Sequence, residues 1–287
     1  MNNLKGKVAF ITGGSKGIGY GVAEALLNQG FKVAITSRSL EAAREAAKEL
    51  ESKGEIIGLE ADVRNYESQQ KAVQSAVDKF GKIDLLVANA GVGKFNSIED
   101  MTPEEWNATI ETNLTGVFYS VKSSLSELVK TEGYIVTISS LAGTNYFAGG
   151  AAYNASKFAL EGLADTLRLE LRGTGINISL IEPGPILSQF RANAFAKYQQ
   201  NIDKANSAHR QIYQAMENRL TKSGPAAPFT LPASAVVDKL IHAVEAKRPQ
   251  LRYYVTFPTY LLGTLKRILP GRALDWVLKK ISRGEQS

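Results

Sequence analysis

The chain has 287 residues, a formal net charge of +6, no cysteine and two histidines. The absence of cysteine excludes disulfides and thiolate metal sites, and two histidines far apart in sequence argue against a zinc site or a histidine-based triad. Between residues 240 and 287 nine Lys and Arg stand against three Asp and Glu, so this segment carries the whole positive excess.

The N-terminal residues contain no apolar run before Val8, which argues against a signal peptide and favours a cytoplasmic protein. The longest uncharged stretch, Gly133 to Ser156, is long enough to span a bilayer. Because it is rich in Gly, Ser, Thr and Asn, we interpret it as a strand, a loop and the start of a helix.

Strand-like and helix-like segments alternate along the chain, which predicts an α/β fold with a parallel sheet covered by helices on both faces. Right-handed crossovers then give a doubly wound, Rossmann-type domain with its ligand site at the carboxyl ends of the strands. Helical patterns occupy Leu40–Lys53 and Pro103–Lys130. The expected strands are Val8–Thr12, Lys32–Ser37, Ile56–Glu60, Leu85–Ala88, Tyr134–Ser139 and Asn177–Ile181.

We expect one domain over residues 1–255, with an insertion at 184–232 and a helical extension at 256–287. The insertion is polar and helical in its middle, Ala192–Leu220, and ends in a run rich in Gly, Pro and Ala. An insertion after a sheet strand is where a substrate lid sits, although a passive surface loop is the alternative.

A glycine-rich loop joins the first strand to the first helix. The residues Thr12-Gly13-Gly14-Ser15-Lys16-Gly17-Ile18-Gly19 allow a tight turn and a close approach to a pyrophosphate, which the helix N-terminus then binds. The loop has the spacing Gly-x-x-x-Gly-x-Gly and predicts a dinucleotide site.

The residues at the end of the second strand indicate which dinucleotide the chain binds. NAD enzymes usually carry an acid here for the ribose 2′-hydroxyl, whereas this chain has Ser37 followed by Arg38. Arg38 and Lys16 can both bind a 2′-phosphate through charge-assisted hydrogen bonds, so we predict NADP(H). The alternative is that both are solvated surface charges.

Tyr153 and Lys157 are four residues apart at the start of a predicted helix that runs to about Arg172, so they share one face. An ammonium about 4 Å from a tyrosine hydroxyl can lower the pKa of that hydroxyl by about three units at an effective dielectric of 20. The pair can therefore form an acid–base group, although most pairs with this spacing are ordinary helix surface.

The pair accompanies other motifs: the glycine loop, Asn89-Ala90-Gly91, Asn113, Ser139-Ser140 and Pro183-Gly184, in that order. Together, over residues 6–190, they resemble the short-chain dehydrogenase/reductase family. The resemblance implies a single seven-stranded domain, with Leu251–Val255 as the last strand. One departure is Ala88, where the family often has an asparagine.

The resemblance also implies roles. Tyr153 would exchange a proton with the substrate oxygen, Lys157 would assist it and bind the nicotinamide ribose, and Ser140, rather than Ser139, would hold that oxygen. Asn113 would keep a helix kinked and position a proton-relay water. The implied cofactor contacts are Gly13, Ser15, Lys16, Gly17, Ile18, Gly19, Ser37, Arg38, Asp62, Val63, Asn89, Gly91, Tyr153, Lys157, Pro183, Gly184 and Ile186.

The C-terminal segment contains two short amphipathic helices with basic polar sides, around Lys266-Arg267 and Lys279-Lys280. These helices can dock on the body and close an apolar substrate pocket, contact a membrane surface, or pack against the core with their lysines outward. The Arg-Tyr and Leu-Pro-Gly-Arg elements here resemble the branch with retinol and 17β-hydroxysteroid dehydrogenases and bacterial aldehyde reductases, which implies an apolar substrate.

We therefore predict an NADPH-dependent reductase of apolar aldehydes or ketones that acts reversibly and needs no metal. A membrane-surface reductase of a lipid-like keto, acyl or steroid-like substrate and a non-catalytic NADP-binding sensor are the alternatives. No nucleic-acid binding is expected, because the basic segment is short and its aromatic residues fit a core. Members of the family often pair through the helices that hold Asn113 and Tyr153, which would give a homodimer or homotetramer, although the C-terminal segment could block or replace that interface.

Overall fold

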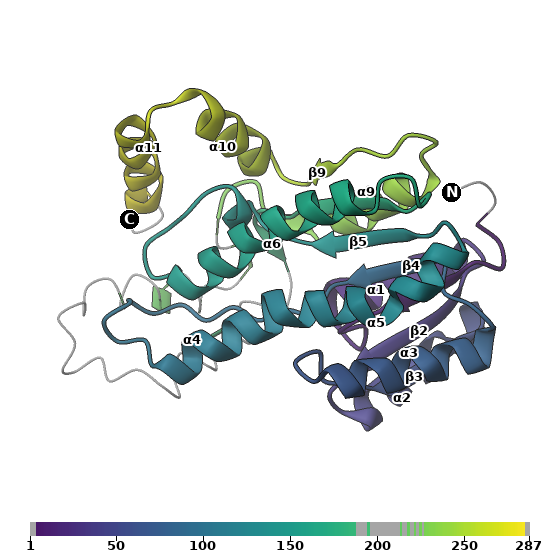
Figure 1. The fold of residues 1–287 in the computed structure, drawn as a ribbon. Helices are drawn as coiled ribbons and strands as arrows, with labels where there is room; N and C mark the ends of the chain where they lie inside the picture. Colours follow the sequence, from purple (N-terminus) through teal and green to yellow (C-terminus); the bar gives the residue numbers. More distant parts are fainter. Residues whose placement is uncertain are drawn as a thin grey trace.

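The computed structural model describes residues 4–187, 194–195, 213, 217–218, 221, 224–225 and 227–284. Its centre is a seven-stranded parallel sheet in the order β3-β2-β1-β4-β5-β6-β9 (Figure 1). This confirms the predicted fold class. The strands are β1 (Val8–Ile11), β2 (Lys32–Ser37), β3 (Ile56–Glu60), β4 (Leu85–Ala88), β5 (Tyr134–Ile138), β6 (Asn177–Glu182) and β9 (Arg252–Tyr254).

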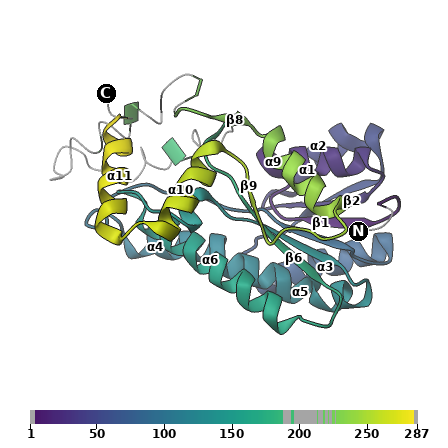
Figure 2. The ribbon, with the colours of Figure 1, turned by 90° about the horizontal axis from the view of Figure 1, so that it is seen from above.

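Helices cover both faces of the sheet, and Figure 2 shows the two layers. One layer holds α1 (Gly17–Asn28), α2 (Leu40–Leu50) and α9 (Ser234–Glu245); the other holds α3 (Tyr66–Phe80), α5 (Gly116–Lys130) and α6 (Ala151–Glu170). Alternate residues of β1 supply the two cores, since Ala9 and Ile11 pack into the first layer and Phe10 into the second.

Local chemistry fixes the helix ends. Ser39 and Asn65 cap α2 and α3 by accepting backbone N–H bonds from Ala42 and Ser68. Thr102 and Glu105 form a capping box that starts α4 (Pro103–Ile110). The helix predicted over Pro103–Lys130 is not one α-helix, because a π-helical turn, η2 (Glu111–Thr115), separates α4 from α5.

Two short 3-10 turns complete the body: η1 (Glu51–Lys53) ends the predicted Leu40–Lys53 helix, and η3 (Leu141–Gly143) follows β5. The predicted insertion begins and ends in a two-stranded parallel sheet, in which β7 (Ile186–Leu187) pairs with β8 (Leu231–Pro232). The predicted helical run Ala192–Leu220 lies almost wholly outside the described residues. Within it, Tyr213 is buried and hydrogen-bonds Asp100 and Ser97 of the loop after β4.

The C-terminal extension forms two helices, α10 (Phe257–Ile268) and α11 (Gly271–Gly284), which lie side by side beyond one end of the sheet (Figures 1 and 2). They pack on the loop between η3 and α6: Tyr146 donates a hydrogen bond to Asp275, and Lys266 lies over the Tyr146 ring. Among the described helices, none combines the length and apolar character that crossing a bilayer requires.

Candidate active site

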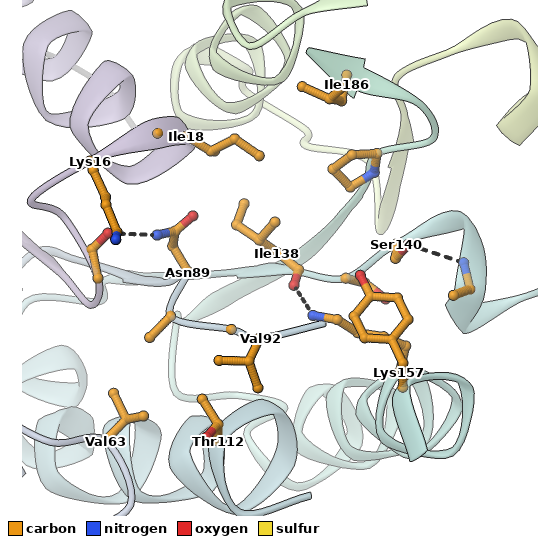
Figure 3. A pocket seen from close by; sticks show the side chains of 18 of the residues that line it. Lys16, Ile18, Val63, Asn89, Val92, Thr112, Ile138, Ser140, Lys157 and Ile186 are labelled. Atoms are coloured by element: carbon orange, nitrogen blue, oxygen red, sulfur yellow. Dashed lines mark hydrogen bonds between the residues drawn. The ribbon is translucent and has the colours of Figure 1, made fainter. Parts of the chain in front are cut away.

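A pocket of about 770 Å³ opens at the carboxyl ends of the central strands, where the strand order reverses between β1 and β4 (Figure 3). Nearly all the residues that the sequence analysis assigns to a site line it. They are Gly13, Ser15, Lys16, Gly17, Ile18, Ser37, Arg38, Asp62, Val63, Asn89, Gly91, Ser140, Tyr153, Lys157, Pro183, Gly184 and Ile186.

The glycine loop fits a phosphate group. Gly13 and Gly17 adopt φ values of +65° and +61°, a region that favours glycine. Lys16 is the N-cap residue of α1, and its side chain accepts no hydrogen bond from the helix backbone. The N–H groups of the helix N-terminus are therefore available for an anion. The backbone of this loop therefore suits the pyrophosphate of a dinucleotide.

Gly19 does not line the pocket, although it was expected to contact the cofactor. A Cβ at this position would lie 2.4 Å from the Gly13 carbonyl oxygen and 2.5 Å from Asn89 Nδ2. The residue is a glycine because α1 packs directly on the loop. Asn89 holds the same loop, since its Nδ2 donates to the carbonyl oxygens of Thr12 and Gly13 at 3.0 Å.

Basic side chains gather at the adenosine end of the pocket. Lys16 and Arg38 line it together with Arg64, which the sequence analysis missed. Arg64 donates to both carboxylate oxygens of Asp62, and this hydrogen bonding lowers the pKa of Asp62. Asp62 therefore faces the pocket as half of an ion pair, and this end carries positive charge from Lys16 and Arg38.

The opposite end holds the predicted catalytic residues (Figure 3). Lys157 Nζ donates to the Ile138 carbonyl oxygen at 2.8 Å. Tyr153 hydrogen-bonds Ser140, whose Oγ also accepts the Ala142 N–H at 3.1 Å. Ser139, which also lines the pocket, donates to Glu161, whereas Ser140 is the serine that hydrogen-bonds the tyrosine.

Burial governs the proton affinities here. It raises the pKa of Tyr153, against the effect of the Ser140 hydrogen bond. Lys157 Nζ lies 5.9 Å from the centroid of the Tyr153 ring, and the lowering of the tyrosine pKa by Lys157 stays a prediction. Burial also lowers the pKa of Lys157 to about 8, which the charge of Glu161 opposes.

Asn113 lies behind the pocket and does not line it. It is fully buried within the π-helical turn η2, where its Oδ1 accepts the Val92 N–H and its Nδ2 donates to Val92 O and Ser156 Oγ. Asn113 therefore joins the interrupted helix to the loop after β4 and to α6, as expected for a residue that stabilises a helix irregularity.

The wall near Tyr153 is apolar. The Phe95 ring packs edge-on against Tyr153, with centroids 5.7 Å apart, and contacts Phe147 at 5.8 Å. Leu141 and Leu187 complete this wall. The sequence analysis missed these residues, because lone aromatic residues in loops carry no pattern that assigns them to a site. No group of three or more His, Asp or Glu suited to a metal is present in the part of the chain that the structure describes.

A pocket at the strand switch point, with a glycine loop at one end and a Ser-Tyr-Lys group at the other, defines an α/β oxidoreductase of the dinucleotide-binding type. Residues 7–199 match the family model described as short chain dehydrogenase. The chain belongs to the short-chain dehydrogenase family.

Relatives support this assignment along the whole chain. The chain is 35% identical over 282 residues to the uncharacterized oxidoreductase YbbO of Escherichia coli, an alignment that covers 96% of this chain and 97% of that protein. It is 37% identical over 183 residues to the 3-oxoacyl-[acyl-carrier-protein] reductase FabG of Vibrio cholerae, covering 63% of this chain and 74% of FabG. It spans 14% of the glycine betaine reductase ATRR of Emericella nidulans.

Among solved structures, a short-chain dehydrogenase/reductase from Burkholderia phymatum in complex with NAD is similar, with a TM-score of 0.79 and 26% identity. The match covers 97% of each chain. The similarity therefore includes the C-terminal part as well as the sheet.

Proposed function

We propose that this chain is an NADPH-dependent reductase that reversibly converts apolar aldehydes or ketones to alcohols. The observation that carries the proposal is the single pocket with Tyr153 and Ser140 at one end and Lys16 and Arg38 at the other. The name of FabG, a 3-oxoacyl reductase, is consistent with carbonyl chemistry on this scaffold.

The positive adenosine end supports NADPH. Ser37 and Arg38, rather than an acid, stand at the end of β2, and Asp62, the one carboxylate among the described residues that line the pocket, forms an ion pair with Arg64. A hydrogen bond to a charged group contributes about 1.5–3 kcal/mol. Each good contact to a 2′-phosphate would therefore favour NADPH over NADH by about ten- to a hundredfold.

The site residues have distinct tasks in the reaction. A bound nicotinamide supplies the hydride. Ser140 donates a hydrogen bond to the substrate carbonyl oxygen, and Tyr153 transfers its phenolic proton to that oxygen as negative charge develops there. Lys157, fixed by the Ile138 carbonyl, provides positive charge beside the tyrosinate that remains. Phe95 and Phe147 exclude water from this end.

The test is NADPH oxidation by the purified protein with aldehydes and ketones of increasing chain length. Turnover should rise with apolar length and fall by about 10²–10⁴-fold in Tyr153→Phe, which removes the proton donor. Tyr146→Phe, which alters a tyrosine outside the pocket, is the matched control. Tight NADPH binding without turnover of any compound would favour the sensor alternative, and turnover retained in Tyr153→Phe would refute the assigned acid.

A second candidate is the same chemistry on a lipid-like carbonyl compound at a membrane surface, and the outward face of α10 favours it. Phe257, Leu261 and Ile268 are 55%, 42% and 68% exposed and recur along one side of the helix. The opposite side, with Thr259 and Leu262, is buried. An apolar stripe that faces solvent is uncommon and marks an interaction site.

The occupant that we propose for this stripe is an anionic bilayer surface. Phe229 contacts Phe257 with ring centroids 4.9 Å apart, so the stripe continues to β8 at the pocket mouth. On α11, the exposed Arg272, Lys279 and Lys280 add positive charge that complements anionic headgroups. A substrate dissolved in the bilayer could then enter the pocket directly.

Vesicle flotation tests the second candidate. The protein should float with phosphatidylglycerol-containing vesicles at low salt and remain at the bottom with phosphatidylcholine alone. Leu261→Asp should abolish flotation, while Leu251→Asp, an exposed leucine at the other end of β9, should not. The membrane-surface candidate is refuted if the wild-type protein never floats. It is also refuted if Leu251→Asp and Leu261→Asp behave alike in flotation.

A further inference from the structure

Directly behind Ser140 and Lys157 lies a group of charged side chains that the proposed mechanism does not use. Glu161 and Asp165 come from α6, Glu182 from the end of β6 and Arg252 from the start of β9. Arg252 Nε donates to Glu161 Oε2 at 3.0 Å, and its Nη2 donates to Asp165 Oδ2 at 2.7 Å. Glu182 Oε1 lies 3.6 Å from Arg252 Nε without a hydrogen bond.

The two inner carboxyls of this group differ in their hydrogen bonds. Glu182 is fully buried and both its oxygens lack a hydrogen-bond partner, and burial raises its pKa to about 8, which favours its neutral form at pH 7. Burial also raises the pKa of Glu161, but hydrogen bonds from Ser139 and Arg252 stabilise its ionised form. Glu161 is therefore the buried carboxylate that pairs with Arg252.

Glu161 reaches the catalytic residues through one hydrogen bond. Ser139 Oγ donates to Glu161 Oε1 at 2.5 Å. Ser139 stands between Ile138, whose carbonyl holds Lys157, and Ser140, which hydrogen-bonds Tyr153. One carboxylate thus fixes the middle residue of the three-residue segment that organises both Lys157 and the substrate oxygen site.

The surrounding backbone keeps this contact close. A Cβ at Gly143 would lie 2.8 Å from both Glu161 Oε1 and Ser139 Oγ, so only a glycine leaves room for their hydrogen bond. Glu161 also lies four residues after Lys157 on α6, on the same side of the helix, and its charge opposes the effect of burial on the lysine.

We propose that Glu161, held by Arg252, is a positioning residue: it anchors the Ile138–Ser140 segment through Ser139 and is the counter-charge of the Lys157 ammonium. This inference rests on the proposed reductase function for its kinetic test. The other titratable or charged groups that face the cluster are Tyr153 and Asp165 from α6, Tyr254 and Arg252 from β9, Glu182 from β6 and Arg267 from α10.

The two roles are separated by two substitutions. Glu161→Gln keeps an acceptor for Ser139 but removes the charge, so the pH at which kcat falls on the alkaline side should move down by about one unit or more. At pH values well above this alkaline midpoint, kcat of Glu161→Gln should be about tenfold or more below kcat of the wild type. Ser139→Ala keeps the charge but removes the anchor, so kcat should fall at every pH with the alkaline limb unmoved.

Asp165→Asn is the matched control, because Asp165 bonds the same guanidinium but makes no contact with Ser139. It should leave the alkaline limb in place. Glu161→Asp keeps the charge on a shorter side chain. In this variant the alkaline fall of kcat should occur at the wild-type pH, but kcat itself should stay below the wild-type value. A wild-type pH profile and kcat in Glu161→Gln would overturn the inference.

A direct titration distinguishes failure of this inference from failure of the proposed function. NMR of the ¹³Cε-labelled lysines follows the protonation of Lys157 without any turnover, with Lys157→Met to assign its signal. The pKa of Lys157 should be lower in Glu161→Gln than in wild type or Asp165→Asn. If the wild type has no reductase activity but the Lys157 pKa is still lower in Glu161→Gln, only the reductase function is refuted. If the Lys157 pKa is the same in both proteins, the counter-charge role of Glu161 is refuted.

Discussion

Replacing Lys157 by methionine should remove activity and yet stabilise the folded protein at neutral pH. Lys157 is buried, and burial lowers its pKa from 10.5 to about 8. That difference corresponds to a cost of about 3 kcal/mol for keeping the ammonium in the folded chain. Methionine has a similar length and no charge, so it removes this cost.

The substitution also has a cost of its own. It deletes the 2.8 Å hydrogen bond to the Ile138 carbonyl, and a hydrogen bond from a charged donor contributes about 1.5–3 kcal/mol. The expected net gain at pH 7 is therefore about 1 kcal/mol. For a chain of this length that corresponds to a rise in Tm of about 2 °C.

The difference between the two proteins should depend on pH and change sign. Because the pKa of Lys157 is lower in the folded chain than in the unfolded chain, the folded chain binds fewer protons between pH 8 and 10.5. Wild-type stability therefore rises with pH across this window relative to Lys157→Met. At pH 10 the wild type, with a neutral lysine that still hydrogen-bonds, should be the more stable protein.

Thermal unfolding of both proteins at pH 7, 8.5 and 10 measures this difference. Lys48→Met, at an exposed lysine of α2, is the control for the loss of a lysine that is not buried. A Tm difference for Lys157→Met that stays constant from pH 7 to 10 would refute burial as the cause.

Three further predictions concern residues in and around the pocket. Arg38→Asp should lower the ratio of kcat/KM with NADPH to that with NADH by about ten- to a hundredfold, measured by initial rates with both cofactors; an unchanged ratio would place the 2′-phosphate elsewhere. Gly19→Ala puts a Cβ 2.4 Å from the Gly13 carbonyl oxygen and should weaken NADPH binding in a fluorescence titration, whereas Gly162→Ala, which meets no atom within 4 Å, should not. Glu182→Gln should raise Tm at pH 9, and this gain should shrink towards pH 5, because a carboxyl with a raised pKa stabilises the fold only at low pH and that contribution is lost as pH rises to about 8.

Sequence patterns were sufficient for the sheet and for most of the pocket. The strands Lys32–Ser37 and Leu85–Ala88 are found where predicted, because apolar runs between turn residues are local signals. The helical pattern over 103–130 does not reveal η2, since a π-helical turn preserves the apolar pattern on either side of it, and only the family resemblance implied a kink at Asn113.

Interactions between distant residues could not be read from the sequence. Arg252 and Glu161 are 91 positions apart, and neither belongs to a recurring pattern that would pair them. Arg64 at the adenosine end was missed because a basic residue in a loop is usually solvated. The apolar stripe of α10 could not be placed from the sequence either: Lys266 and Arg267 are exposed, as the pattern indicated, but Phe257 and Ile268 face solvent as well.

The pairing of β7 with β8 bears on how this scaffold can diversify. Leu231 N donates to Pro185 O, and Ile186 lies beside Leu231, so the chain leaves the body and returns to it at the same place. Because the entropic cost of closing a loop grows only slowly with its length, the residues between these two strands can be lengthened, shortened or exchanged without disturbing the sheet. Ala227 and Thr230, at the end of that stretch, line the pocket, so exchanges there can reshape the pocket while Ser140, Tyr153 and Lys157, which lie on other elements, stay unchanged.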